Sequence, residues 1–96
     1  MRWIWDEEKN RTNKLKHGLC FETAALVFDD PLALTCEDPH PDGDRLRTVG
    51  AVGWATLFVV HTIPEWDARE DEEIGRIVSA RKATARERNA YEEGDY

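Results

Sequence analysis

The segment WATLFVVHTI, residues 54–63, is apolar at almost every position. A strand with this pattern is buried on both faces, whereas a half-exposed strand alternates apolar and polar residues. The preceding segment RLRTVGAVG, residues 45–53, is amphipathic in this second sense. Because consecutive strands joined by a short turn pair antiparallel, we expect an antiparallel sheet with residues 54–63 in its middle.

The charged residues near the N-terminus predict a surface helix over residues 7–17. Asp6 is a suitable N-cap and Gly18 a suitable C-cap, with acids in the first turn and bases in the last. That order complements the helix dipole at both ends. The apolar face is thin, with Leu15 nearly alone, so the helix is expected to lie at the surface.

Two further helices are predicted. Apolar residues at helical spacing indicate a second helix over residues 21–28, which Pro31 follows and which buries one face. Thr84 and Glu87 form a capping box that opens a last helix ending near Glu93. The remaining strands are predicted at residues 32–38 and 74–81, residues 3–5 are compatible with a further short strand, and the acidic connection 64–73 is predicted to lack a helix. The fold class is therefore α+β, an antiparallel sheet of about four strands with two N-terminal helices and one C-terminal helix.

The length of 96 residues predicts a single domain, residues 1–96, with one modest core. No apolar run approaches the roughly 20 residues of a membrane span, and the N-terminus lacks the apolar core of a signal peptide. We therefore expect a cytoplasmic protein. Cys20 and Cys36 are too few for a disulfide framework, so reduced thiols are expected, with a single bridge as the alternative.

A metal site is not predicted. Cys36 and His40 suggest half a zinc site, but structural zinc takes four ligands and only His17 and His61 remain as histidines. The acidic turn at residues 39–44 invites calcium, although its spacing does not match a calcium-binding loop. We predict no metal and no cofactor.

The net charge of -7 hides a segregated distribution. Residues 65–73 contain six acids and one base, whereas residues 76–91 contain five bases and one acid. Local fields decide where a polyanion docks, so the basic segment is the candidate anion-binding surface. The alternative is a solvated charged face. The overall charge disfavours a general nucleic-acid binder, and no helix-turn-helix pattern supports a DNA-binding module.

Three blocks of the chain resemble the BrnT toxin family: WDEEKNRTNKLKHGLCFETAALVFDDP, RLRTVG and RIVSARKATARERNAYEE. The family shows a Trp-Asp, a Lys-His-Gly and a Phe-Asp-Asp-Pro-like stop in that order. Its most distinctive block is Arg-Ile-Ile-Ser-Ala-Arg followed by a Glu-Arg-x-x-Tyr helix. The resemblance covers about residues 3–93.

The resemblance implies a toxin of a type II toxin–antitoxin system, with a RelE-like fold and a ribonuclease activity that halts translation. It also implies a BrnA-like antitoxin with a ribbon-helix-helix DNA-binding portion. The complex is expected to repress its own operon and to reach operator DNA only through the antitoxin.

The basic segment offers residues suited to RNA cleavage without a metal. Such cleavage needs a base for the 2′-hydroxyl, cations for the phosphate and an acid for the leaving oxygen. Arg81 suits a phosphate clamp, because an arginine fork holds two phosphate oxygens. Glu87 and Tyr91 share one face of the last helix, as a base and as a residue that orients or stacks on a nucleobase. Arg76 can join Arg81 only through a bulge or a strand end, because a regular strand puts them on opposite faces.

His17 is preferred as a further titrating group, since its neighbour Lys16 adds phosphate affinity. The other predicted RNA contacts are Lys82, Arg86 and Arg88. The acidic connection 64–73 would oppose RNA binding if it lay beside these residues.

Structural alternatives stay open for each candidate. Glu87 can serve only the capping box, and Tyr91 can pack its helix on the sheet. Arg76 can pair with an acid of the preceding loop. His17 is favoured at a helix C-terminus by the dipole, and His61 fits a satisfied sheet histidine. The matching alternative function is a catalytically inactive co-repressor that binds an antitoxin.

Overall fold

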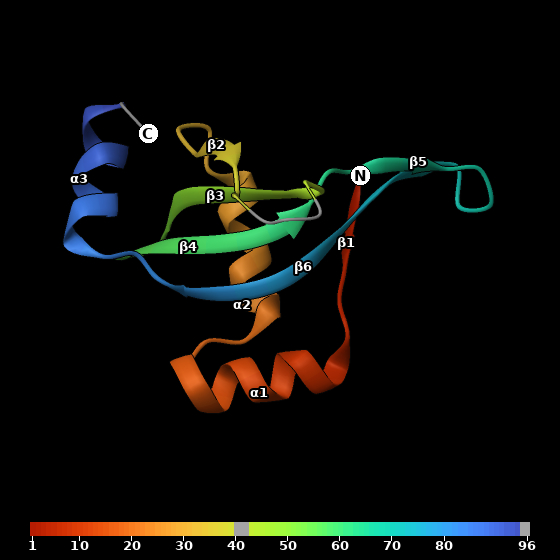
Figure 1. The fold of residues 1–96 in the computed structure, drawn as a ribbon, viewed down its shortest axis with the longest axis horizontal. Helices are drawn as coiled ribbons and strands as arrows, with labels where there is room; N and C mark the ends of the chain where they lie inside the picture. Colours follow the sequence, from red (N-terminus) through yellow and green to blue (C-terminus); the bar gives the residue numbers. More distant parts are fainter. Residues whose placement is uncertain (40–42, 95–96) are drawn as a thin grey trace.

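The computed structural model describes residues 1–39 and 43–94. The described residues form six strands, three α-helices and a 3₁₀ helix (Figure 1). Their order is β1 (Arg2–Ile4), α1 (Glu7–His17), α2 (Phe21–Ala24), η1 (Ala25–Asp29), β2 (Leu34–Glu37), β3 (Arg45–Val52), β4 (Ala55–Thr62), β5 (Glu65–Asp67), β6 (Glu72–Lys82) and α3 (Ala85–Glu93). The α+β class is confirmed.

The sheet has the order β1-β6-β4-β3-β2, with β5 paired to β6 off this path. The apolar strand β4 lies in the middle, as predicted. The expectation of about four antiparallel strands is wrong, because the sheet is mixed and β1 runs parallel to β6. The chain makes a long excursion between these two strands, and that length leaves their relative direction free.

The segment 64–73 contributes the strand that the sequence analysis missed. β6 begins at Glu72 and is longer than expected, but β4 pairs only with its second part, from Ile77 to Lys82. β5 pairs with the first part, where Glu65 lies opposite Ile74. This pairing satisfies backbone groups of β6 that β4 does not reach.

The second predicted helix is two short elements, so the expectation of one helix over residues 21–28 is wrong in detail. α2 ends at Ala24 and continues as the 3₁₀ helix η1. Phe21, Ala24 and Val27 are all fully buried. Spacing by three residues aligns side chains in a 3₁₀ turn, so this geometry keeps all three on one buried line.

The core lies between these helices and one face of the sheet. Leu57 and Val59 of β4 pack with Phe21, Ile77 and Ala80 in one buried cluster. The opposite sheet face, called the open face below, carries the cross-strand neighbours Arg47, Val60 and Ser79 and also the buried pair Val49 and Phe58. α3 contacts β3.

Two buried asparagines attach α1 to the rest of the domain. The Asn10 side chain accepts a hydrogen bond from the N–H of Phe21 at 2.7 Å. The Asn13 amide donates to the carbonyl of Ala80 at 2.7 Å and accepts from its N–H at 3.1 Å. Leu15 is exposed, so the prediction of a surface helix is confirmed, but polar contacts rather than an apolar face hold the helix.

The predicted caps of α1 are present, with Asp6 accepting two backbone N–H bonds and Gly18 in the left-handed region. Both cysteines are free and half-buried. Within the described ranges, no helix is long and apolar enough to cross a membrane. The turn expected at residues 39–44 lies partly outside the described residues. His40 belongs to the part that is not described.

Candidate functional site

A β-bulge in β6 decides which side chains reach the open face. Ile77 and Ala80 lie three positions apart, which in a regular strand would place them on opposite faces. Both nevertheless belong to the buried cluster. The register explains this, because His61 pairs with Ile77 and Val60 with Ser79, which leaves Val78 as an extra residue.

The bulge places Arg76 and Arg81 on the same face. Each is adjacent to a buried residue, Ile77 or Ala80, and therefore points away from the core. From the sequence, their shared use was expected only with such a bulge or at a strand end. Their Cα atoms are roughly 15 Å apart along the strand, so the two arginines start from separate points of the open face.

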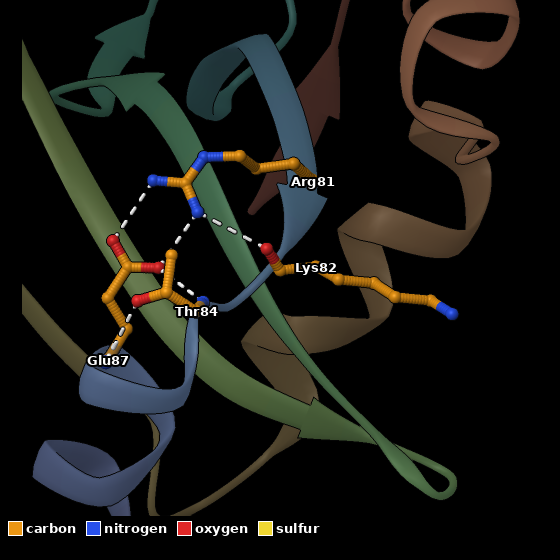
Figure 2. Close-up of polar contacts among 4 residues, drawn as sticks. All are labelled: Arg81, Lys82, Thr84 and Glu87. Atoms are coloured by element: carbon orange, nitrogen blue, oxygen red, sulfur yellow. Dashed lines mark hydrogen bonds and ion pairs between the residues drawn. The ribbon is translucent and has the colours of Figure 1, made fainter.

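Arg81 and Glu87 form a bidentate ion pair in the basic segment (Figure 2). The two terminal nitrogens of Arg81 donate to the two carboxylate oxygens of Glu87 at 2.8 and 3.0 Å. The guanidinium carbon lies 4.0 Å from the centroid of the Phe58 ring, a cation–π contact from the same sheet face. Arg81 also donates to the carbonyl of Lys82 at 3.2 Å, while the Lys82 side chain points away (Figure 2).

Glu87 closes the predicted capping box as well. Its carboxylate accepts from the N–H of Thr84 at 2.8 Å, and the Thr84 hydroxyl accepts from the N–H of Glu87 at 3.2 Å. The hydrogen bonds from Arg81 lower the pKa of Glu87, against the opposing effect of burial. Glu87 is therefore an ionised carboxylate fixed beside a guanidinium at the junction of β6 and α3.

Tyr91 lies on α3 one turn beyond Glu87 and has a different partner. Its hydroxyl donates to the carboxylate of Asp30, which also accepts the N–H groups of Ala51 and Leu32. The hydrogen bond to Asp30 raises the pKa of Tyr91. Burial would raise the pKa of Asp30, but the bonds from Ala51, Tyr91 and Leu32 lower it. Tyr91 thus ties α3 to the end of η1, where Asp30 is the C-cap, and the role of Asp30 was not predicted from the sequence.

His17 and Lys16 lie at the exposed end of α1. They line a surface cavity of about 360 Å³ with Val78 and Ser79, beside the bulge of β6. Arg81 and Glu87 are not among the described residues that line this cavity. The structure therefore does not join His17 to the Arg81–Glu87 pair.

His61 is the satisfied sheet histidine that the sequence predicted. It is buried, and its Nδ1 must donate to the carbonyl of Thr62 at 2.9 Å, because a carbonyl only accepts. Its Nε2 then accepts from the Thr48 hydroxyl at 2.7 Å. Burial lowers the pKa of His61, so the ring is neutral and engaged on both sides.

The remaining cations are exposed at several points of the surface. Arg86 and Arg88 lie on α3, and Arg88 shares a cavity with Lys82 and Trp54. Arg76 lines another cavity with acids, but it forms no ion pair in the part of the chain that the structure describes. Its predicted alternative role as a structural ion-pair partner is therefore not found there. No three His, Cys, Asp or Glu side chains of the described residues gather where they could hold a metal ion.

These features define a small α+β domain whose open sheet face bears Arg47, Arg76 and Arg81 and ends at an Arg–Glu pair. Arginines in this setting suit the recognition of phosphate oxygens. The family comparison agrees, since the model described as ribonuclease toxin, BrnT, of type II toxin–antitoxin system matches residues 5–87. The chain therefore belongs to the BrnT family of ribonuclease toxins, and the resemblance seen in three sequence blocks is confirmed. A comparison with curated proteins found no match.

Proposed function

We propose that this chain is an endoribonuclease that cleaves RNA without a metal ion at the junction of β6 and α3. Arg81 clamps the scissile phosphate, and Glu87 accepts the proton of the attacking 2′-hydroxyl. The single observation that carries the proposal is the bidentate contact between Arg81 and Glu87, which fixes a phosphate-binding group and an ionised base side by side.

The proposed reaction begins with an exchange of partners. An incoming phosphate replaces Glu87 on the guanidinium of Arg81, because both anions fit the same fork. The pKa of Glu87 then rises toward its ordinary value, since its largest lowering contact is lost. The carboxylate takes the proton of the 2′-hydroxyl, the 2′-oxygen attacks phosphorus, and the bond to the 5′-oxygen breaks.

The leaving 5′-oxygen needs a proton from a separate acid. His17 stays the predicted candidate on residue type, although its position beside the bulge calls for RNA to bridge the two sites. Lys16, Lys82, Arg86 and Arg88 are proposed to hold flanking phosphates. Arg76 is proposed to reach a phosphate other than the one that Arg81 holds, because the two residues are far apart along β6.

Tyr91 has a weaker claim to a catalytic role. Its hydroxyl is engaged by Asp30, so we propose that it acts by holding α3 in place rather than by touching the scissile group. The earlier expectation that it orients or stacks on a nucleobase stays a prediction.

The direct test is incubation of the purified chain with total RNA in EDTA. Cleavage is expected from the wild type and from Arg69→Ala, an exposed arginine at the acidic end. Arg81→Ala and Glu87→Gln are expected to lose cleavage, while thermal melting shows that both variants remain folded. Intact RNA at high excess of the wild-type chain rejects the proposal.

We further propose that cleavage inhibits translation and that a BrnA-like ribbon-helix-helix antitoxin neutralises the chain and alone contacts operator DNA. The membership of a toxin–antitoxin family supports an antitoxin partner. Inducing the chain alone is expected to arrest growth, and co-expression of the neighbouring reading frame is expected to restore it.

The antitoxin is proposed to cover the basic surface with an acidic segment. The double charge reversal Arg86→Glu with Arg88→Glu should then weaken antitoxin binding and reduce its dependence on salt. Unchanged affinity and salt dependence would instead place the antitoxin on another surface.

The ion pair between Arg81 and Glu87 also supports a second candidate function. Glu87 neutralises Arg81 in the free chain, as expected of an inactive protein that only binds an antitoxin as a co-repressor. Harmless expression, together with intact RNA in EDTA and a stable antitoxin complex, would support this candidate over the nuclease.

A further inference from the structure

Trp54 is the most exposed large apolar side chain of the described residues, with a relative exposure of 106%. It occupies the two-residue turn between β3 and β4, after Gly53 at φ 60°. Two-residue hairpins favour glycine at such a position because it adopts positive φ without strain. The turn projects a full indole into solvent at the tip of the hairpin.

The surroundings of Trp54 are cationic. Trp54, Lys82 and Arg88 line one surface cavity of about 350 Å³, together with Thr56 and Ala83. Within the described ranges, neither Lys82 nor Arg88 forms an ion pair with an acid. A chain of net charge -7 therefore leaves two cations without acidic partners next to a bare aromatic ring.

The hairpin tip is also fixed relative to the proposed cleavage site. The N–H of Ala83 donates to the carbonyl of Thr56 at 2.9 Å, which fastens the base of the turn to the end of β6. Lys82 directly follows Arg81 in this strand. Trp54 is thus held at a constant offset from Arg81, as a positioning surface requires.

We propose that Trp54 stacks on one nucleobase of single-stranded RNA while Lys82 and Arg88 hold the adjacent phosphates. Aromatic rings beside cations are the arrangement that binds single strands without reading sequence, because every base offers a flat face. The inference rests on the proposed ribonuclease function and adds a substrate contact next to the reacting pair. A bound base at Trp54 positions its strand so that a neighbouring phosphate reaches Arg81.

Trp66 provides the internal comparison. It is also exposed, at 62%, but its cavity contains three acids, Glu65, Asp67 and Asp44, against one cation, Arg76. The acids outnumber the cation there, so an exposed indole alone does not define the contact. The charge around Trp54 argues for a polyanion there, and an acidic peptide would use the two cations without needing the ring.

The test measures binding of a short, dye-labelled, single-stranded 2′-O-methyl RNA, which the enzyme cannot cleave because the attacking hydroxyl is blocked. Trp54→Ala is expected to weaken binding by about fivefold to a hundredfold, as for the loss of one stacked base. Trp54→Phe should keep most of the affinity, and Trp66→Ala should change nothing. Each variant is checked by thermal melting, which an exposed turn residue should leave unchanged.

The salt dependence separates stacking from charge. Lys82→Ala and Arg88→Ala should each reduce the slope of log affinity against log salt by about 0.7, the value for one phosphate on a single strand. Trp54→Ala should leave the slope at its wild-type value. A slope that falls equally in Trp54→Ala would mean that the indole only supports the cations, which overturns the stacking contact.

The outcomes distinguish the two levels of proposal. If the wild type cleaves RNA in EDTA but Trp54→Ala binds the 2′-O-methyl RNA as tightly as the wild type, the stacking inference is wrong and the nuclease stands. If Trp54→Ala weakens only the complex with the antitoxin, the surface belongs to the partner protein. If the wild type neither cleaves nor binds RNA, both proposals fall together.

Discussion

The two ends of β6 carry opposite charge although they belong to one strand. The strand starts with Glu72 and Glu73 and ends with Arg81 and Lys82, roughly 30 Å away. Figure 1 shows the β5–β6 turn at one end of the sheet and α3 at the other. The acidic connection 64–73 therefore does not cover the Arg81–Glu87 pair, and its charge does not oppose RNA at that end.

The two ends are also held differently. The acidic end has backbone partners on both sides, because β1 and β5 both pair with residue Ile74 of β6. Among the described residues, the cationic end has β4 on one side and the side-chain amide of Asn13 on the other. A side-chain brace holds the backbone there without adding a further strand, so the cationic end remains the open end of β6.

The largest difference between the two ends of β6 is expected in the effect of Arg81 on the cleavage rate. Arg81→Ala is expected to lower the cleavage rate by on the order of a hundredfold, the usual cost of losing a donor to the developing charge. Arg81→Lys should recover part of it, because a lysine supplies the charge without the fork. Arg76→Ala, nearer the acidic end, should lose clearly less. Equal losses in the two alanine variants would show that the proposed division between the ends is wrong.

The brace of the cationic end is tested by Asn13→Ala. This change leaves the N–H and carbonyl of Ala80 without their partners in a buried setting, so the free energy of unfolding should fall by about 1–3 kcal/mol. Thr12→Ala, on the exposed side of the same helix, should lower the free energy of unfolding by much less. Chemical denaturation measures both, and similar losses would mean that Asn13 does not brace β6.

A pH effect comes from His61, between the two ends. Because burial lowers its pKa in the folded state below the ordinary value of 6.5, the unfolded chain binds the proton more readily. The His61 contribution to stability is therefore complete above pH 6.5 and is lost as the pH falls below it. His61→Gln should remove that part of the slope, whereas His17→Gln should keep it. An unchanged slope in His61→Gln would assign the effect to other groups.

The smallest effect is expected at the acidic end. Arg2 lies 3.5 Å from Glu70 and 3.0 Å from Glu72, and all three side chains are solvent-accessible. Arg2→Ala should therefore cost less than about 1 kcal/mol in the free energy of unfolding. A loss as large as that of Asn13→Ala would show that charge, rather than backbone pairing, holds the acidic end.

Local sequence signals predicted much of this fold. Caps placed α1 and α3 correctly, and the apolar run located the middle strand. The parallel pairing of β1 was not predictable in the same way, because it joins the two ends of the chain and depends on packing. Trp3 stacks on Phe28, and Gly75 admits its ring, since a Cβ there would lie 2.3 Å from it.

The candidate site was predicted only in part. Arg81, Glu87 and the capping box were identified from residue type and spacing, but their direct contact depends on how β6 turns into α3. The bulge at Val78 was considered only as a condition. Val78 is itself apolar, so the pattern of residues along the strand gives no sign of an extra residue there. Asn13 was missed because a polar residue on a thin-faced helix looks solvent-exposed until its partner strand is known.

The central claim is that RNA binds at the cationic end of β6 and not at the acidic end. The most direct measurement is an NMR titration of isotope-labelled protein with uncleavable single-stranded 2′-O-methyl RNA. The account predicts shifts of the backbone signals of Arg81, Lys82 and Glu87, with the signals of residues 65–73 unmoved. Shifts concentrated in residues 65–73, or binding without any change at Arg81 and Glu87, would contradict it.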